Sequence, residues 1–312
     1  MMNMINAMNL KALLFSPKVK RKGFVLVSVL MLSVLLISCA TAFSWFVRQQ
    51  AKSISRERIN LTYRSMAHVL VSSMTNVLAE LASRIGYDSP TQRWYQPFVL
   101  PLDGLGIWVV QITPLDDKIP IRNLFLPDEN TLRRELSDAW QKMWEELGHR
   151  ELEQLVLDFL DRNTKPRVGG VEYDGFLNRQ LYDMSELLML SHDIDAQLLA
   201  DIEDYCTVYS DGRINLNVAP VHVMELLPGL DTGQIAQSIA HARREKPLET
   251  LRDIQELPGA SPRTATQLTN IAGFKSRYFR VRIESFNDND GGMSYNIVID
   301  RTTRQIVRWE EL

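Results

Sequence analysis

The apolar stretch near the start of the chain constrains its fold more than any other feature. Residues 24–47 contain no charged side chain. As an α-helix rising about 1.5 Å per residue, they would extend about 36 Å, enough to cross a hydrocarbon core about 30 Å thick. A secretory signal peptide has a shorter apolar region, of about 7–15 residues, before its cleavage site. We therefore predict a membrane-spanning helix that stays attached to the chain.

The residues before this run set the orientation of the predicted span. They contain no acid and five bases, which are Lys11, Lys18, Lys20, Arg21 and Lys22. An excess of Lys and Arg marks the cytoplasmic side of a span, so residues 48–312 should lie outside the cytoplasm. The whole chain has a formal net charge of −3, and the leader bases leave −8 for residues 24–312. This balance disfavours non-specific binding of nucleic acid.

Hydrophobic periodicity predicts an α+β fold interrupted by helices. Apolar residues from Met66 to Ile85 recur every three or four positions, which predicts that the spanning helix continues to Ile85. Residues 107–112 and 119–125 are typical of a β-hairpin, and strands return at 278–286, 294–300 and 305–309, with a turn at 287–292. Between them the pattern predicts helices over 129–148, 151–162, 194–206, 219–227, 231–244, 248–257 and 261–271.

This pattern defines five segments. They are a basic cytoplasmic leader (1–23), a transmembrane segment (24–47), a helix with the first strands (48–126), an inserted helical domain (127–274) and C-terminal strands (275–312). The two cysteines, Cys39 in the span and Cys206 far outside it, cannot form a disulfide within the chain. Stability must come from apolar cores.

No catalytic constellation is present in the sequence, so we predict that the chain is not an enzyme. The five histidines are isolated, and the sequence contains no His-Glu-x-x-His, Gly-x-Ser-x-Gly or phosphate-loop motif. A group of acids around Gly169-Gly170 is the candidate metal site, because calcium takes six to eight oxygens from carboxylates and carbonyls. The candidate ligands are Asp158, Asp161, Glu172, Asp174, Asp183 and Glu186. The alternative is solvated acids and helix caps, which suits Asp183 before Ser185 and Glu186.

A Leu-Pro-Gly turn occurs twice in the helical region. Residues 225–236 and 256–265 both have the pattern of a helix, this turn and a second helix. Helix-hairpin-helix units of this kind can present backbone amides to phosphate. The alternative is that the two units pack on each other as a scaffold. The acidic charge and the absence of a basic cluster at Gly229 favour the scaffold and no nucleic-acid partner.

The order of basic leader, glycine, phenylalanine and apolar helix resembles the type IV prepilin-like proteins. In that family a membrane-bound prepilin peptidase cuts after the glycine and methylates the new amino terminus, which here implies processing between Gly23 and Phe24. Most members have glutamate at the fifth mature position, where this chain has Ser28. The resemblance therefore narrows to the minor pseudopilins that lack this glutamate, the protein K family of the type II secretion system.

Three further stretches resemble the protein K family. They are Lys118-Ile-Pro-Ile-Arg-Asn123-Leu124, Asn178-Arg-Gln-Leu-Tyr-Asp-Met-Ser-Glu-Leu187 and Gly212-Arg-Ile-Asn-Leu-Asn-Val-Ala219. The chain departs from the family pattern in having Leu124 directly after Asn123, Val218 where threonine is common, a shortened segment between Glu172 and Asn178, and a longer leader of 23 residues. These departures bear on the metal site more than on the resemblance itself.

The resemblance implies a pseudopilin fold with a large inserted helical domain. It also implies a single-pass protein of the bacterial inner membrane with most of its chain in the periplasm, calcium in the inserted domain, and other minor pseudopilins as partners. The function it implies is capping the tip of the type II secretion pseudopilus and helping to start its assembly for protein export.

A lipoprotein is the rival interpretation. Leu36-Ile37-Ser38-Cys39 fits the pattern before a lipidated cysteine, which would make the chain a periplasmic structural protein lipidated at Cys39. However, residues 40–47 remain uncharged where a lipoprotein usually becomes polar. A tethered enzyme is a third class, but it lacks a site. The mature amino terminus separates the three: methylated Phe24, lipidated Cys39 or an uncut leader.

Overall fold

The computed structural model describes residues 22–190, 193–230, 233–287 and 292–312. The basic leader up to Arg21 and most of the predicted turn at 287–292 lie outside the described residues. Contacts divide the chain into two units, Met1–Arg64 and Ser65–Leu312.

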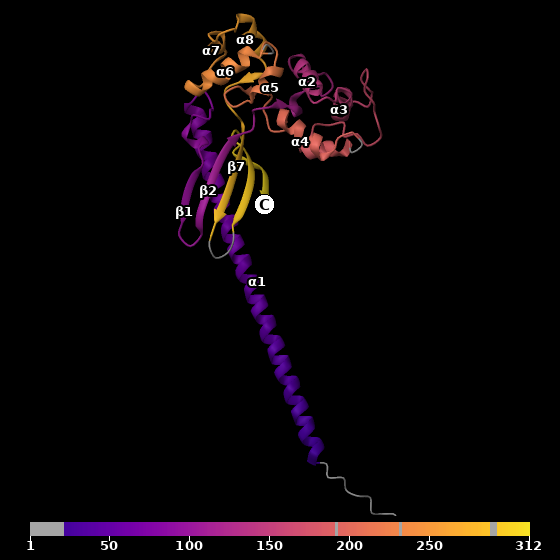
Figure 1. The fold of residues 1–312 in the computed structure, drawn as a ribbon, viewed down its shortest axis with the longest axis vertical. Coiled ribbons are helices and arrows are strands. Elements are labelled where there is room, and N and C mark those ends of the chain that lie inside the picture. Colours follow the sequence, from indigo (N-terminus) through magenta and orange to yellow (C-terminus); the bar gives the residue numbers. More distant parts are fainter. Residues whose placement is uncertain (1–21, 191–192, 231–232, 288–291) are drawn as a thin grey trace, which may run out of the picture. The chain divides into compact units, whose positions relative to one another are not determined.

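A long helix begins the described chain. Helix α1 spans Lys22–Arg84, which confirms the prediction of one helix running through the apolar stretch to about Ile85 (Figure 1). Among the described residues, α1 is the helix that is long and apolar enough to cross a membrane, judged by length and composition. The helix ends just before Gly86 and Pro90, residues that favour termination.

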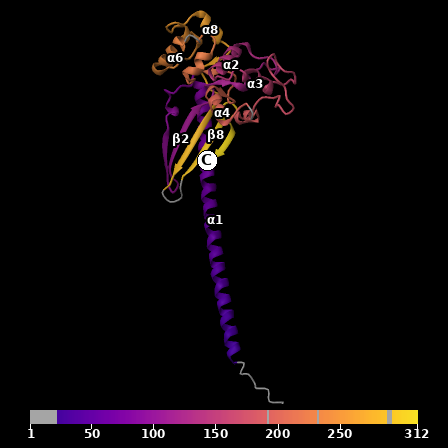
Figure 2. The same cartoon turned by 45° about the vertical axis from the view of Figure 1, so that its right-hand side comes forward.

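The second unit contains an antiparallel sheet, of which Figure 2 labels β2 and β8. Its strand order is β1-β2-β7-β8-β9. Its strands are β1 (Phe98–Leu102), β2 (Gly106–Pro114), β7 (Tyr278–Phe286), β8 (Met293–Asp300) and β9 (Gln305–Glu311). Burial alternates along β7, where Phe279, Val281 and Ile283 are buried. This period of two is that of a strand with one face in a core, and it confirms the predicted C-terminal strands.

The C-terminal part of α1 lies against this sheet. The side chains of Ala67, Val71 and Leu78 are buried, and they follow the three- and four-residue spacing of one helix face. His68 stacks on Trp309 of β9, with 4.0 Å between ring centroids. The sheet and the end of α1 therefore share one apolar core.

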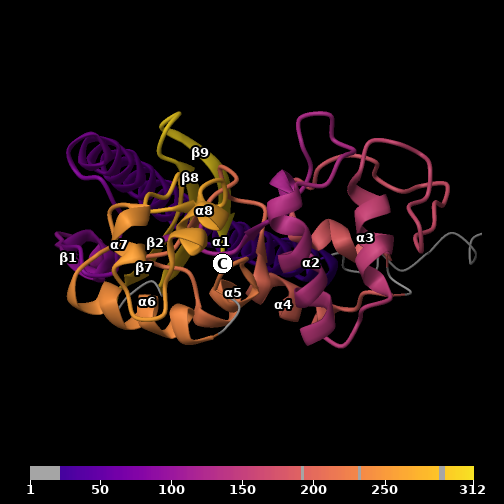
Figure 3. The same cartoon turned by 90° about the horizontal axis from the view of Figure 1, so that it is seen from above.

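Residues 115–277, between β2 and β7, form a helical insertion. Its α-helices are α2 (Arg134–Glu146), α3 (Leu152–Leu160), α4 (Ala196–Tyr205), α5 (Val221–Leu226), α6 (Gln234–Glu245), α7 (Leu251–Gln255) and α8 (Pro262–Leu268). They confirm the predicted helices. Figures 1 and 3 show α2–α4 and α5–α8 as two neighbouring groups.

A continuous apolar core runs through both groups of helices, from Ile119 to Ala272. Trp140 and Trp144 of α2 are fully buried within it and meet edge to face, with 5.5 Å between ring centroids. Truncating a fully buried tryptophan to alanine typically costs about 3–5 kcal/mol, so either substitution should strongly destabilise the insertion.

Several short elements lie within the insertion or between α1 and β1. They are the 3-10 helices Arg93–Tyr95, Ile121–Asn123 and Met184–Leu190 and the short strands β3 (Ile119–Pro120), β4 (Cys206–Thr207), β5 (Ile214–Asn215) and β6 (Ala272–Gly273). Strand β3 pairs in parallel with β4, and β5 with β6.

The predicted hairpin between residues 107–112 and 119–125 is wrong. Strand β2 pairs with β1 on one side and β7 on the other, so neither of its edges is free for residues 119–125. Ile119 and Ile121 are instead buried in the core of the insertion. The insertion therefore begins after Pro114, earlier than the predicted boundary at residue 127, and ends just before Tyr278.

Candidate functional site

The predicted processing site, the bond between Gly23 and Phe24, lies in α1 next to the leader. The leader up to Arg21 is outside the described residues, so processing at this bond stays a prediction.

Ser28 forms its hydrogen bond within its own helix. Its hydroxyl donates to the carbonyl oxygen of Phe24 at 2.9 Å. Ser33 and Ser38 donate in the same way, at 2.8 Å each, to the carbonyl four residues before them. A helix in lipid must satisfy its polar groups internally. Ser28 therefore needs no partner from another chain.

A second apolar strip on α1 is only partly covered. Leu70, Met74, Leu81 and Ile85 are half-buried, and Val77 is 49% exposed. Their spacing of four, three, four and four residues places them side by side on the helix, next to the buried face. The apolar face predicted from Met66 to Ile85 therefore has two parts. One packs against the sheet, and the other is this partly covered strip.

The strip ends in an apolar groove. The groove measures about 710 Å³ and is lined by Leu81, Ile85, Trp94, Pro97 and Phe98, with Gln92, Arg93 and Gln96 at its sides. The residues that follow α1 thus extend the partly exposed apolar surface beyond the end of the helix. Apolar surface of this kind is typical of an interface.

The six predicted calcium ligands do not form one site. Asp183 pairs with Arg308 of β9 and accepts the backbone N–H of Ser185 at 2.9 Å, as a capping residue would. Glu186 accepts two guanidinium hydrogen bonds from Arg179, at 2.8 and 3.2 Å. These bonds hold the pKa of Glu186 below its usual range. Asp183 and Glu186 therefore have structural roles, which fit the alternative interpretation of solvated acids and helix caps better than metal binding.

The remaining candidates lie near the end of α3. Asp158 and Asp161 are fully buried, and burial raises the pKa of each. Glu172 interacts electrostatically with both, and its pKa is also raised, first by burial. Asp174 is exposed.

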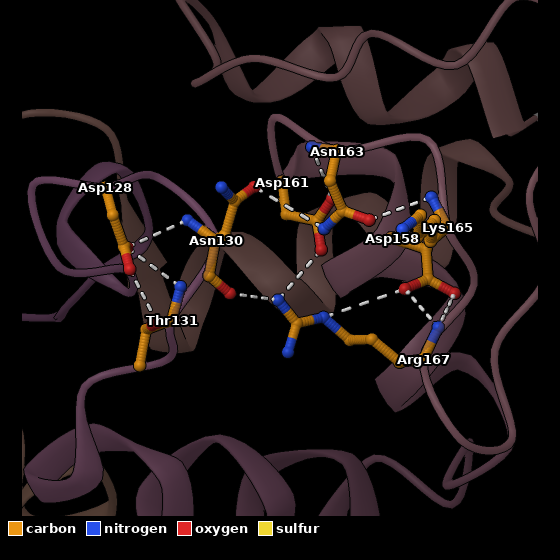
Figure 4. A network of polar contacts seen from close by, with 8 residues as sticks. All are labelled: Asp128, Asn130, Thr131, Asp158, Asp161, Asn163, Lys165 and Arg167. Atoms are coloured by element: carbon orange, nitrogen blue, oxygen red, sulfur yellow. Dashed lines mark hydrogen bonds and ion pairs between the residues drawn. The ribbon is translucent and has the colours of Figure 1, made fainter.

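This arrangement does not fit a calcium ion. In the part of the chain that the structure describes, no three His, Cys, Asp or Glu side chains gather closely enough to hold a metal. Arg167 lies between Asp158 and Asp161, and its Nη2 donates to Asp161 Oδ2 at 2.8 Å (Figure 4). A guanidinium therefore stands where the prediction would require a metal.

The two helix-turn-helix repeats pack on each other. A Cβ atom at Gly229, in the first turn, would lie 2.7 Å from Gln267 Oε1 and 3.3 Å from Thr264 Cα, both in α8, the helix that follows the second turn. A Cβ atom at Gly259, in the second turn, would lie 3.6 Å from Ile235 Cγ1 of the first repeat. Each turn therefore faces the opposite repeat, which favours the scaffold interpretation over phosphate binding.

A buried polar junction connects the sheet, helix α1 and the insertion. Arg301 Nη1 donates to Asp88 Oδ1 at 2.8 Å, and the two side chains are 6% and 5% exposed. Asp88 Oδ2 accepts the backbone N–H of Ser276 at 2.7 Å. Asn215 Nδ2 donates to the Asp88 carbonyl at 3.2 Å and to Ser276 Oγ at 2.9 Å. Asn215, in the stretch from Gly212 to Ala219 that resembles the protein K family, therefore has a structural role.

Asp116 fastens the two ends of the insertion to each other. Its carboxylate accepts backbone N–H groups from Asp211 at 3.2 Å, Arg277 at 2.8 Å and Tyr278 at 2.9 Å. Burial raises its pKa to about 7. The predicted hairpin of residues 107–112 and 119–125 gave no role to Asp116, because the three N–H groups come from segments far away in the chain. Its position directly after a strand was the available signal.

The fold defined by these elements is α+β, with a long N-terminal helix, a small antiparallel sheet and a helical insertion. No family model matches the chain, and no curated protein matches its sequence. A solved structure does share the fold. It is a chain of the GspK-GspI-GspJ complex from the type 2 secretion system of enterotoxigenic Escherichia coli, with a TM-score of 0.61.

The two chains are 17% identical, and the match covers 85% of this chain and 99% of that one. At this identity the likeness establishes the fold. It confirms the fold class predicted from the sequence and agrees with the resemblance stated there. The solved chain belongs to a complex of the type 2 secretion system.

Proposed function

We propose that this chain is a minor pseudopilin that caps the tip of a type II secretion pseudopilus and helps to start its assembly. In this proposal α1 anchors the chain in the inner membrane, and a prepilin peptidase processes it between Gly23 and Phe24. The likeness in fold to a chain of the GspK-GspI-GspJ complex carries the proposal. The candidate membrane span in α1 supports it.

Ser28 supports a position at the tip. A processed amino terminus is a positive charge, and a charge at the centre of a membrane costs about 2.5–3.5 kcal/mol unless it is paired. Within a filament, a glutamate at the fifth position of a neighbouring subunit can provide the pair. A subunit with no neighbour above it has no amine to neutralise, and its own glutamate would remain a buried, unpaired acid. Ser28 avoids that cost, because its hydroxyl bonds to Phe24.

The insertion supports the same position. Residues 115–277 are as many as a whole domain usually contains, and they have their own apolar core. A body of this size emerging between β2 and β7 would obstruct a further subunit stacked on top. It would obstruct nothing at the tip.

The partly covered strip on α1 is the proposed interface with the neighbouring pseudopilins. The strip from Leu70 to Ile85 has the spacing with which one helix packs along another. The groove beside Trp94 and Phe98 extends it by residues outside the helix. A partner that presents an apolar helix face would cover both.

Site-specific cross-linking tests this interface. The full chain carrying Val77→Cys would be produced together with the other minor pseudopilins of its genome, in a Cys39→Ser background. Ser72→Cys is the matched control, since Ser72 is also exposed and lies about 140° around the helix from Val77. We expect cross-links from position 77 and none from position 72. Equal cross-linking, or none to any pseudopilin, would contradict the interface, and repeated copies along the filament would contradict the tip position.

Lipidation at Cys39 remains the alternative. Cys39 is exposed on α1, so its thiol is open to modification, but cleavage before it would remove the first part of a continuous helix. Mass measurement of the mature amino terminus decides between the two. Methylated Phe24 supports the pseudopilin, and a lipidated Cys39 supports the alternative.

A further inference from the structure

Arg167 lies between two buried carboxylates at the end of α3 (Figure 4). The side chains of Asp158 and Asp161 have no exposed surface, and that of Arg167 is 23% exposed. Arg167 Nη2 donates to Asp161 Oδ2 at 2.8 Å, and Nε lies 3.6 Å from Asp158 Oδ1. The backbone N–H of Arg167 donates to both oxygens of Asp158, at 3.0 and 3.1 Å. One residue thus compensates both acids.

The same guanidinium binds a second loop to this cluster. Its Nη2 also donates to the carbonyl oxygen of Asn130. Asp128 fixes the turn that presents this carbonyl, because its Oδ1 accepts the backbone N–H groups of Asn130 at 3.0 Å and Thr131 at 2.9 Å. Arg167 therefore connects this turn to the end of α3, as Figure 4 shows.

The oxygens around Arg167 already accept hydrogen bonds. Asp161 Oδ1 accepts the backbone N–H of Asn163 at 3.2 Å, and Asn163 Oδ1 accepts that of Lys165 at 2.8 Å. A Cβ atom at Gly170 would lie 1.8 Å from Asp158 Oδ2, so the main chain covers this carboxylate closely. Calcium needs six to eight oxygens at 2.3–2.6 Å, and the guanidinium holds the central position instead.

We propose that Arg167 is the resident cation of the insertion, joining Asp158, Asp161 and Asn130 as a metal ion would, so that this region folds without calcium. The planar guanidinium suits this task, because it can donate several hydrogen bonds in fixed directions and stays charged. The inference does not depend on the proposed pseudopilin function, since it concerns only what holds the insertion together.

Removing the guanidinium should leave Asp158 and Asp161 as buried acids without a counter-charge. Among the described residues, no three His, Cys, Asp or Glu side chains gather closely enough to hold a metal. Calcium should therefore not replace the guanidinium in a variant that lacks it.

Thermal unfolding of the full chain in detergent micelles tests the proposal, with calcium chloride in excess or with EGTA. We expect the unaltered chain to have the same Tm in both. Arg167→Gln should lower the Tm by about 10 °C, to the same extent in calcium and in EGTA. Arg167→Lys is the matched control, which keeps the charge but not the planar fork, and its loss should be smaller.

Each result decides for or against the proposal. A Tm of the unaltered chain that rises with calcium in a saturable way would overturn it. An Arg167→Gln variant with an unchanged Tm would also overturn it. If Arg167→Gln does not fold, the calcium response of the unaltered chain and the Tm of Arg167→Lys decide. Arg167 is supported as the resident cation if the Tm of the unaltered chain does not change with calcium and the Tm of Arg167→Lys lies below it while the variant still folds.

Discussion

A single substitution in the buried pair between Asp88 and Arg301 should strongly destabilise the second unit. Asp88→Asn removes the negative charge that faces Arg301. The guanidinium then remains buried without a counter-charge. Both side chains are almost completely buried, at 5% and 6% exposure. Breaking a buried pair in this way costs about 3–5 kcal/mol. For a domain of this size we expect the Tm to fall by roughly 6–20 °C.

The assay is thermal unfolding of the full chain in micelles, followed by tryptophan fluorescence. Glu80→Gln is the control, because Glu80 pairs with Arg84 while both side chains are more than half exposed, and its Tm should change by less than about 2 °C. The double variant Asp88→Asn with Arg301→Met should lose less than Asp88→Asn alone, since no unpaired charge remains. If Asp88→Asn behaves like Glu80→Gln, or the double variant loses the sum of the two single losses, the reasoning is refuted.

Three further predictions concern processing, pH and a turn. Gly23→Leu should leave full-length precursor in the membrane, and normal maturation by mass spectrometry would exclude this cleavage site. Because the folded state raises the pKa of Asp116 to about 7 from an unfolded value of about 3.9, its contribution to stability is present below pH 4 and is lost as the pH rises to 7. The slope is at most about 1.4 kcal/mol per pH unit, and Asp116→Asn should flatten it in denaturant titrations. Gly106→Ala should lower the Tm more than Gly104→Ala, because both glycines have positive φ but only a Cβ at Gly106 meets backbone, 2.1 Å from the Phe286 oxygen.

Local patterns were sufficient to predict most elements. The apolar run and the three- and four-residue spacing gave α1, and the helices of the insertion followed from the same periodicity and from Gly and Pro breaks. Alternation predicted β7, β8 and β9. These signals are reliable because each depends on residues within one or two turns of each other. Strand β1 was missed, since Pro101 lies in it and proline in a strand is tolerated mainly at a sheet edge, which is where β1 lies.

Local sequence patterns were sufficient for the apolar helix, the order of helices and strands and the acidic character of the chain. Which distant residues meet depends on tertiary packing. It gave β2 the partners β1 and β7, brought Asp88 to Arg301, and placed Arg167 between Asp158 and Asp161. An acid near a glycine turn has the same local signature whether it binds a metal or an arginine. The choice depends on which cation the folded chain brings within hydrogen-bonding distance, and only the packing of the insertion sets that.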